Sequence, residues 1–204
     1  HEGQARAAGA GVGARAGEHA AMEHGEHRVL ALDVDLDLAV AALAEAELVP
    51  GRMEPVDGGQ DFGVVVDYAH TPDAMTRVLA TLRPLTPGRL VLVFGCGGDR
   101  DRAKRPEMAR IAVEGADLVA ITTDNPRTED PERIMDDMES GMGGAPHLRI
   151  SDREEAIHRV LAETGPGDTV LLAGKGHETY QIIGTTKHHF GERTIVRAAL
   201  EGRT

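Results

Sequence analysis

Four short segments of the sequence combine glycine, histidine and charged residues, which are the residue types that bind and orient small ligands. The segments are Asp67-Tyr68-Ala69-His70, Gly95-Cys96-Gly97-Gly98-Asp99-Arg100, Asp124-Asn125-Pro126-Arg127 and Gly174-Lys175-Gly176-His177-Glu178. A guanidinium binds a carboxylate through two parallel hydrogen bonds, and a carboxylate binds an ammonium group. Arg100 and Arg127 together with Glu178 therefore predict a pocket for a zwitterion, and an amino acid is the natural ligand of such a pocket.

The glycine-rich segment 95–98 also permits a dinucleotide-binding interpretation, because it follows a predicted strand and precedes a predicted helix. In the G-x-G-x-x-G fingerprint, however, Arg100 occupies the position of the third glycine. Asp99 and Asp101 would in addition place negative charge beside a pyrophosphate. We therefore favour a loop whose glycines let the backbone approach a small ligand, with Arg100 directed at a carboxylate or a phosphate. A NAD-binding domain is the alternative interpretation.

Other residues of these segments permit several interpretations. His70 beside Asp67 is compatible with an acid–base pair, a nucleotide contact or a structural cap. Cys96 is interpreted as a small packed residue, because no base partner for a nucleophile is evident. Lys175 and Glu178 fit a ligand site but also a solvated loop. No G-x-x-x-x-G-K-[ST] motif occurs, so ATP chemistry would need a further domain, and no metal site is predicted.

The elements that position these segments alternate between strands and helices. Branched aliphatic runs predict strands over 62–67, 89–95, 117–122, 148–150 and 169–174. Helices are predicted over 72–82, 105–113, 131–138 with Asp130 as N-cap, from a capping box at 151–154, and over 192–200. A terminal antiparallel hairpin is predicted from 181–183 and 187–190. The alternation indicates an α/β fold with a mostly parallel sheet and helices on both faces, whose strand ends bring the four segments to one edge.

Composition excludes several classes of protein. The 204 residues carry a formal net charge of -12, from 34 acidic and 22 basic side chains, which argues against a nucleic-acid binder with a basic surface. The single cysteine, Cys96, excludes an internal disulfide and a zinc site built from several cysteines. No apolar run approaches about 18 residues and no signal-peptide pattern opens the sequence, so we expect no membrane partner and a cytoplasmic location.

The amino-acid composition also changes along the sequence. Residues 1–27 are rich in alanine, glycine and histidine and poor in branched aliphatic residues, so we predict a flexible tail whose histidines are incidental. A helix is predicted over 35–48, ended by Pro50-Gly51, which marks a domain boundary. Residues 51–204 are predicted to form one α/β domain.

Five stretches of this domain resemble the carboxy-terminal domain of the Mur ligases, and among them the members that add meso-diaminopimelate. The stretches are VPGRME at 49–54, VVVDYAHTPDA at 64–74, VFGCGGDRDRAKRP at 93–106, DNPR at 124–127 and LLAGKGHETYQIIG at 171–184. The resemblance covers about residues 49–200, and more weakly 36–48. The segment 28–50 resembles the helical end of the family's central ATPase domain.

The resemblance implies a Rossmann-like fold and a role in peptidoglycan synthesis. In the family, ATP phosphorylates the D-glutamate carboxylate of UDP-MurNAc-L-Ala-D-Glu, and the amine of meso-diaminopimelate attacks the acyl phosphate. By motif position, meso-diaminopimelate would be held by Arg100, Asp124, Asn125, Pro126, Arg127, Gly174 and Glu178, with Arg127 selecting it over lysine. ATP would contact Arg52, Asp67 and His70, and magnesium is implied as its companion. No residue is assigned a catalytic role.

The sequence also departs from the family pattern. It has no match to the amino-terminal uridine-nucleotide domain, to the central GKT phosphate loop, or to the carbamylated lysine that helps to hold magnesium. Gly191-Glu192 stand where the family usually has paired aspartates. We therefore expect this chain to bind the amino acid but not to catalyse ligation alone, and to meet the UDP-linked dipeptide only together with the other domains. A stand-alone, non-catalytic module for an amino acid or a nucleotide is the alternative.

Overall fold

The structure is a computed structural model that describes residues 36–45 and 48–202, and the chain divides into two units, His1–Glu47 and Leu48–Thr204. The described part of the first unit is helix α2, Leu36–Glu45, which lies within the helix predicted over 35–48. The predicted tail 1–27 lies outside the described residues. The second unit contains all the segments that carry candidate site residues.

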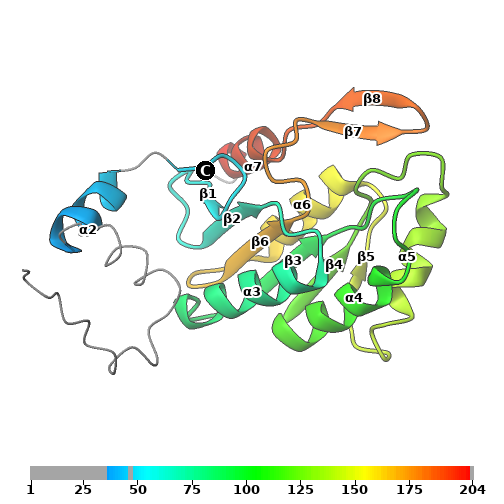
Figure 1. The fold of residues 1–204 in the computed structure, drawn as a ribbon, viewed down its shortest axis with the longest axis horizontal. Coiled ribbons are helices and arrows are strands. Elements are labelled where there is room, and N and C mark those ends of the chain that lie inside the picture. The colour runs from blue at the N-terminus through cyan, green and yellow to red at the C-terminus, as the bar shows by residue number, and fades with distance from the viewer. Residues whose placement is uncertain (1–35, 46–47, 203–204) are drawn as a thin grey trace, which may run out of the picture. The chain divides into compact units, whose positions relative to one another are not determined.

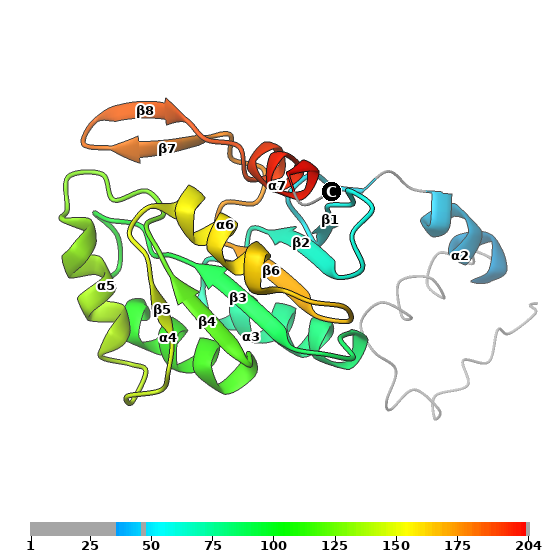
Figure 2. The ribbon, with the colours of Figure 1, turned by 180° about the vertical axis from the view of Figure 1, so that it is seen from behind.

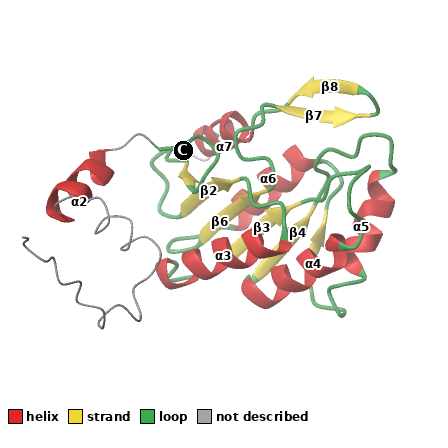
Figure 3. Cartoon of the chain, in the orientation of Figure 1, coloured by secondary structure: helices red, strands yellow, loops and turns green. Residues whose placement is uncertain are grey.

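The second unit is built on a six-stranded sheet with the strand order β1-β2-β6-β3-β4-β5 (Figure 1, Figure 3). The strands are β1 Glu54–Pro55, β2 Gly63–Asp67, β3 Leu90–Phe94, β4 Leu118–Ile121, β5 Leu148–Arg149 and β6 Thr169–Ala173. All neighbouring strands are parallel except β1 with β2, so the predicted α/β fold with a mostly parallel sheet is confirmed. Strand β1 was not predicted, because two residues that include a proline show no hydrophobic alternation.

The burial of the central strands explains why their sequences are continuous apolar runs. Strands β3 and β6 are buried along their whole length, and Leu92 pairs with Leu171 in the register between them. Side chains alternate between the two faces of a strand. Leu92 and Phe94 therefore pack into one core cluster, whereas Val91 and Val93 pack into the other. Both faces of the sheet are covered, as parallel sheets require.

Helices cover the two faces (Figure 1, Figure 2). One face packs against α3 Pro72–Leu82, α4 Lys104–Gly115 and α5 Pro131–Glu139, and a short 3-10 turn, η1 Arg83–Leu85, follows α3. The other face packs against α6 Arg153–Glu163 and α7 Glu192–Glu201. None of the described helices is long and apolar enough to span a membrane.

Helix starts follow the predicted capping with one correction. The side chain of Asp130 accepts a hydrogen bond from Glu132 N at 3.0 Å and caps α5, as predicted. At 151–154, however, the N-cap of α6 is Asp152, whose carboxylate accepts from Glu155 N at 2.9 Å. Ser151 instead donates its hydroxyl to the carboxylate of Glu132. An aspartate satisfies the free N–H groups of a first turn as well as a serine does. The N-cap therefore lies one residue later than predicted.

The predicted terminal hairpin forms a small sheet of β7 Tyr180–Ile183 and β8 Thr186–His189, with Gly184 in its turn. Backbone hydrogen bonds attach it to the turn after β4. Arg127 N donates to Ile182 O at 3.0 Å, and Gly184 N donates to Arg127 O at 2.7 Å. The hairpin therefore lies against one of the four predicted ligand segments.

A buried ion pair joins α6 to α7. Arg153 and Glu192 are both almost fully buried, and Arg153 Nε donates to Glu192 Oε1 at 2.8 Å. Arg153 also donates from Nη2 to the carbonyl oxygen of Ala173 at 2.9 Å, at the carboxyl end of β6. Glu192, one of the two residues that depart from the family pattern, therefore acts through Arg153. Together they support the end of β6, which precedes Gly174.

Candidate functional site

A cleft of about 560 Å³ lies beyond the carboxyl ends of β2, β3, β4 and β6. All four predicted segments contribute to its wall, as expected for a parallel sheet. Of the residues predicted to contact the amino-acid ligand, six line the cleft: Arg100, Asp124, Asn125, Arg127, Gly174 and Glu178. Pro126 faces a neighbouring hollow of about 460 Å³ instead, which it shares with Arg127. The structure therefore brings together the predicted residues of three separate loops.

Glycines bring the loop after β3 against the turn after β4. A Cβ atom on Gly98 would lie 1.8 Å from the carbonyl oxygen of Pro126, and one on Gly95 would lie 2.4 Å from that of Thr122. Gly98 N donates to Asn125 O at 2.9 Å across this contact. Two backbones can approach this closely only where one of them carries no side chain. The segment thus uses its glycines for close backbone packing beside the cleft.

Arg105 supports the glycine-rich loop after β3 through hydrogen bonds. It was not predicted as a site residue. Its side chain is fully buried, and Nη2 donates to Gly97 O at 3.2 Å and to Glu129 Oε1 at 2.8 Å. Glu129 also accepts from Asp99 N at 2.6 Å. The hydrogen bond from Arg105, helped by the one from Asp99, lowers the pKa of Glu129 to about 2. Sequence reasoning placed Arg105 only at the start of a helix, where nothing distinguishes it from a surface arginine.

Arg127 and Arg100 present guanidinium groups to the cleft in different ways. Arg127 has a left-handed backbone with φ 53, and its Nη1 donates to Gly98 O at 2.8 Å and to Asn125 O at 3.4 Å. Arg100 is exposed and donates only from Nη1, to Asp99 O at 3.2 Å. The Nε and Nη2 groups of both arginines bond to no described residue. Both side chains therefore keep donors for a ligand carboxylate.

Lys175 is buried rather than solvated, so the solvated-loop interpretation is wrong for this residue. It lies between Gly174 and Gly176, whose φ angles of 113 and 52 are conformations that favour glycine. Nζ lies 2.8 Å from the carbonyl oxygen of Tyr180, 3.2 Å from Asn125 Oδ1, 3.2 Å from Asp124 Oδ1 and 3.5 Å from Glu178 Oε2. The contact with Asp124 is an ion pair without hydrogen-bond geometry, because Oδ1 has no hydrogen-bond donor among the described residues.

The acidic side of the cleft is ordered by hydrogen bonds between its members. Asn125 Nδ2 donates to Glu178 Oε2 at 3.0 Å, while Asn125 Oδ1 accepts from Ile182 N at 2.9 Å. Gln181 Nε2 donates to Asp124 O at 2.7 Å. The side chains of Asp124 and Glu178 remain only 11% and 16% exposed, on the wall of the cleft. The lining of the cleft therefore includes both carboxylates and guanidinium groups, as a zwitterion requires.

The predicted nucleotide contacts gather around Tyr68, which sequence reasoning did not single out. The guanidinium of Arg52 lies 4.8 Å from the centre of the Tyr68 ring. The rings of His70 and His177 lie 4.5 Å and 5.3 Å from it. Lys104, which also lines the cleft, donates from Nζ to His70 O at 2.8 Å. Flat rings and cations at this end of the cleft suit a base or a phosphate.

Asp67 has a backbone role in the structure. Its Oδ2 accepts from Met53 N at 2.8 Å and its Oδ1 from Ala69 N at 2.7 Å, and the residue is buried. His70 bonds through Nδ1 to the Tyr68 carbonyl oxygen at 2.8 Å. Among the described residues, Asp67 and His70 share no hydrogen bond, so the structure does not support an acid–base pair. The contact of Asp67 with ATP stays a prediction.

Neither Cys96 nor a cluster of metal-binding side chains adds further chemistry to the described part of the chain. The Cys96 thiol is buried at the base of the cleft, and burial raises its pKa to about 12, so it is protonated at neutral pH and fits its interpretation as a packed residue. No three histidine, cysteine, aspartate or glutamate side chains of the described part of the chain are grouped as a metal site would need. The described residues therefore form no metal-binding group made of three such side chains.

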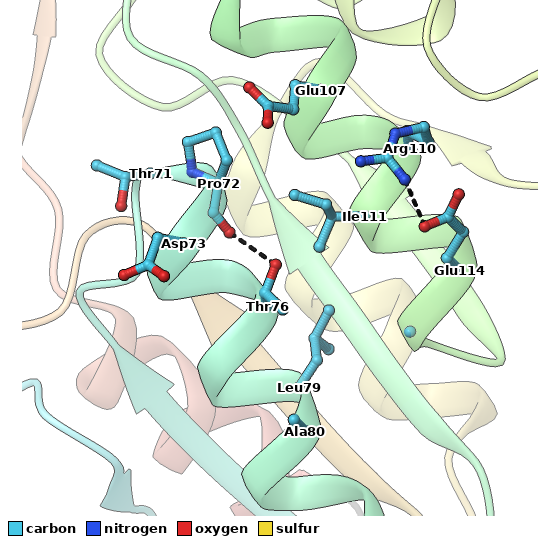
Figure 4. A pocket seen from close by; sticks show the side chains of 11 residues that line it. Thr71, Pro72, Asp73, Thr76, Leu79, Ala80, Glu107, Arg110, Ile111 and Glu114 are labelled. Atoms are coloured by element: carbon cyan, nitrogen blue, oxygen red, sulfur yellow. Dashed lines mark hydrogen bonds and ion pairs between the residues drawn. The ribbon is translucent and has the colours of Figure 1, made fainter.

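A second hollow, of about 760 Å³, lies between α3 and α4 and contains none of the predicted site residues. Its polar side chains bond within their own helices (Figure 4): Thr76 donates to Pro72 O at 3.0 Å, and Arg110 pairs with Glu114 at 2.6 Å. Leu79 and Ile111 supply apolar surface between them (Figure 4). This hollow offers a ligand no converging set of charges, so the cleft at the strand ends is the candidate site.

Comparison with known proteins shows which proteins this chain resembles. Residues 51–176 match the family model described as "Mur ligase, glutamate ligase domain". The chain is 54% identical over 178 residues to the UDP-N-acetylmuramoyl-L-alanyl-D-glutamate--2,6-diaminopimelate ligase of Trichormus variabilis, covering 86% of this chain. It is 51% identical over 176 residues to the ligase of the same name from Geobacillus kaustophilus, covering 85% of this chain. It spans only 36% of the length of either relative.

Solved structures of related proteins have the same fold. A solved structure of a UDP-N-acetylmuramoyl-L-alanyl-D-glutamate--2,6-diaminopimelate ligase superposes with a TM-score of 0.72 at 44% identity, over 87% of this chain and 37% of that one. The MurF ligase of Thermotoga maritima in complex with ADP superposes with a TM-score of 0.58 at 18% identity, over 87% of this chain and 37% of that one. The second likeness concerns the fold alone. Together they confirm the fold expected from the five resembling stretches.

Proposed function

Since the chain belongs to the Mur ligase family, we propose that residues 51–204 are the amino-acid-binding domain of a ligase that adds meso-diaminopimelate to UDP-MurNAc-L-Ala-D-Glu. One observation carries the proposal: the cleft joins Arg100 and Arg127, which keep unused donors, to a buried cluster of Asp124, Lys175 and Glu178. Positive and negative groups thereby face one small space. In this proposal the segment 28–50 is the end of the central ATPase domain, and the cytoplasm is where the protein acts.

The proposed reaction needs this domain to bind and orient the nucleophile. The D-glutamate carboxylate first receives a phosphoryl group, which ATP supplies. The free amine of meso-diaminopimelate then attacks the acyl carbon, so that a C–N bond forms while the C–O bond to phosphate breaks, and the amine loses a proton. Holding the amine close to the acyl carbon replaces an encounter in solution, which is a large part of the rate enhancement of such enzymes.

The two ends of meso-diaminopimelate explain how one domain can both bind the ligand and leave it reactive. Each end carries an ammonium and a carboxylate. In the proposal, Arg127 and Arg100 bind the carboxylate of one end while Glu178 and Asp124 bind its ammonium, with Asn125, Pro126 and Gly174 shaping the wall. The amine of the other end stays free to attack. Lysine has a carboxylate only at its α end. When its α amine is the one that attacks, the end held in the cleft has no carboxylate, so the donors of Arg127 would stay unpaired.

The nucleotide contacts proposed for this domain are fewer. Arg52 and His70 lie around Tyr68, which lines the cleft, and would contact ATP there. Asp67 holds the backbone at Met53 and Ala69 and would act by keeping that surface in place. Magnesium and the UDP-linked dipeptide would be bound by the other domains of the enzyme, because the described residues do not form a metal-ligand group.

Calorimetry with the 204-residue chain tests this function. We expect meso-diaminopimelate to bind at least about tenfold more tightly than L-lysine, because a charge-assisted hydrogen bond contributes about 1.5–3 kcal/mol. Arg127→Ala should abolish most of this preference. Arg133→Ala, which removes an exposed arginine of α5 outside the cleft, is the matched control and should keep it. Absence of meso-diaminopimelate binding by the unaltered chain would contradict the proposal, and ligation by this chain alone would contradict its expected inactivity.

A further inference from the structure

Lys175 is the one lysine of the described residues that is fully buried, since Lys104 is only half-buried and Lys187 is exposed. An ammonium has no acceptor and at most three hydrogens to donate. Four oxygens surround Nζ within 3.5 Å, two of them from carboxylates. The amine of Lys175 is thus fully occupied by the protein. It can act on a ligand only through the groups that it holds.

The first of these groups is the amide of Asn125, whose orientation Lys175 determines. Because the ammonium only donates, the oxygen of the amide must face it, and Asn125 Oδ1 lies 3.2 Å from Nζ. Ile182 N donates to the same oxygen at 2.9 Å. The amide nitrogen therefore faces Glu178 and donates to its Oε2 at 3.0 Å. Without the ammonium, one of the two donors that fix this orientation is lost.

The second effect is electrostatic. Asp124 and Glu178 bring two negative charges to a poorly solvated wall, and Lys175 supplies one positive charge between them, at 3.2 Å and 3.5 Å. The three side chains together carry a net charge of one negative unit when all are ionised. A ligand ammonium would balance that charge. Loss of Lys175 would leave two carboxylates with mutual repulsion, which separates them or protonates one of them.

We propose that Lys175 is a positioning residue that shapes Asp124, Asn125 and Glu178 into a subsite for the ammonium group of the bound amino acid. This inference rests on the proposed function, because it names how the same site recognises one part of its ligand. It assigns the shaping of the ammonium subsite to a residue that does not line the cleft. Arg127 and Arg100, which would bind the carboxylate, do not contact Nζ, so the two halves of recognition should respond separately to substitution.

The test separates the two halves with two ligands. Pimelate has the carbon chain and both carboxylates of meso-diaminopimelate but no amino groups. We expect K175M to lower the association constant of meso-diaminopimelate at least about tenfold and that of pimelate less than about twofold, measured by calorimetry and NMR titration on the 204-residue chain. R133M removes an exposed cation of α5 outside the cleft and is the matched control, expected to change neither constant.

Each outcome has a distinct meaning. Equal losses for both ligands in K175M, or no loss for either, would overturn the positioning role. A chain of natural sequence that binds no meso-diaminopimelate would overturn the proposed function and this inference with it. If K175M does not unfold cooperatively on heating, the double variant K175M/D124N is used, because D124N removes one of the carboxylates that face Lys175. Its binding is then compared with that of D124N alone. A selective loss of meso-diaminopimelate affinity is again expected there, and its absence would overturn the positioning role.

Discussion

Nη1 of Arg127 donates a 2.8 Å hydrogen bond to the carbonyl oxygen of Gly98, which joins the loop after β3 to the turn after β4. The same turn is held by the hairpin, because Arg127 N donates to Ile182 O. The guanidinium therefore has its position fixed from two sides while part of it remains available to a ligand. Anything that moves the glycine loop should also move this guanidinium.

Gly98→Ala tests that dependence. A Cβ atom at this position would lie 1.8 Å from the carbonyl oxygen of Pro126, so the loop and the turn must separate. We expect a destabilisation of about 1–3 kcal/mol, as for overpacked sites, together with loss of meso-diaminopimelate binding. Thermal unfolding and calorimetry measure the two effects. Gly165→Ala is the control, because nothing lies within 4 Å of the added carbon, and its stability and binding should stay near those of the unaltered chain.

Acid should loosen the same loop through Glu129. Its pKa is held at about 2, mainly by the hydrogen bond from Arg105, against about 4.3 for an unperturbed glutamate. A group with a lowered folded-state pKa stabilises the fold above its unfolded-state pKa, and this contribution is lost as pH falls from about 4.3 towards 2. Urea unfolding between pH 6 and about 2.5 should therefore show a smaller loss of stability in Glu129→Gln than in the unaltered chain.

A control is needed because Asp168 titrates in the same range, its pKa also lowered to about 2 by its hydrogen bond with Arg89. Glu155→Gln, which removes an exposed carboxylate of α6, is the matched control. If Glu129→Gln and Glu155→Gln give the same curve, Glu129 is not the group whose protonation weakens the loop.

The buried pair of Arg153 and Glu192 predicts a non-additive response. Replacing either partner alone leaves a buried charge without its counterpart, which we expect to cost about 3–5 kcal/mol of unfolding free energy. The double variant R153M/E192L should be more stable than either single variant, because it leaves no unpaired charge. Denaturant unfolding of all four chains measures the coupling. Additive losses would mean that the two side chains act independently despite their 2.8 Å hydrogen bond.

The sequence predicted the sheet and the convergence of the candidate site, for a physical reason. Strands β3 and β6 are covered on both faces, so their sequences are almost wholly apolar and easily recognised. Once the strands are known and parallel, their carboxyl ends must meet at one edge. Arg127 after β4 and Glu178 after β6 could therefore be placed in one cleft without any coordinates.

What the sequence did not predict depends on contacts between distant side chains. Whether Lys175 is solvated or buried is decided by oxygens from Tyr180 and from the turn after β4, not by its neighbours in the loop. Arg105 supports the glycine loop only because Glu129 and Asp137 come to it from a later segment. Periodicity reports which residues face a core, but it carries no information on which buried charge meets which.

The composition of the cleft has one practical consequence. The chain has no tryptophan and only two tyrosines, Tyr68 and Tyr180, and both of them line the cleft. Essentially all of its intrinsic ultraviolet fluorescence must therefore arise from side chains that line this cleft. Tyrosine emission, observed without any label, would report directly on what enters that space and on nothing elsewhere in the chain.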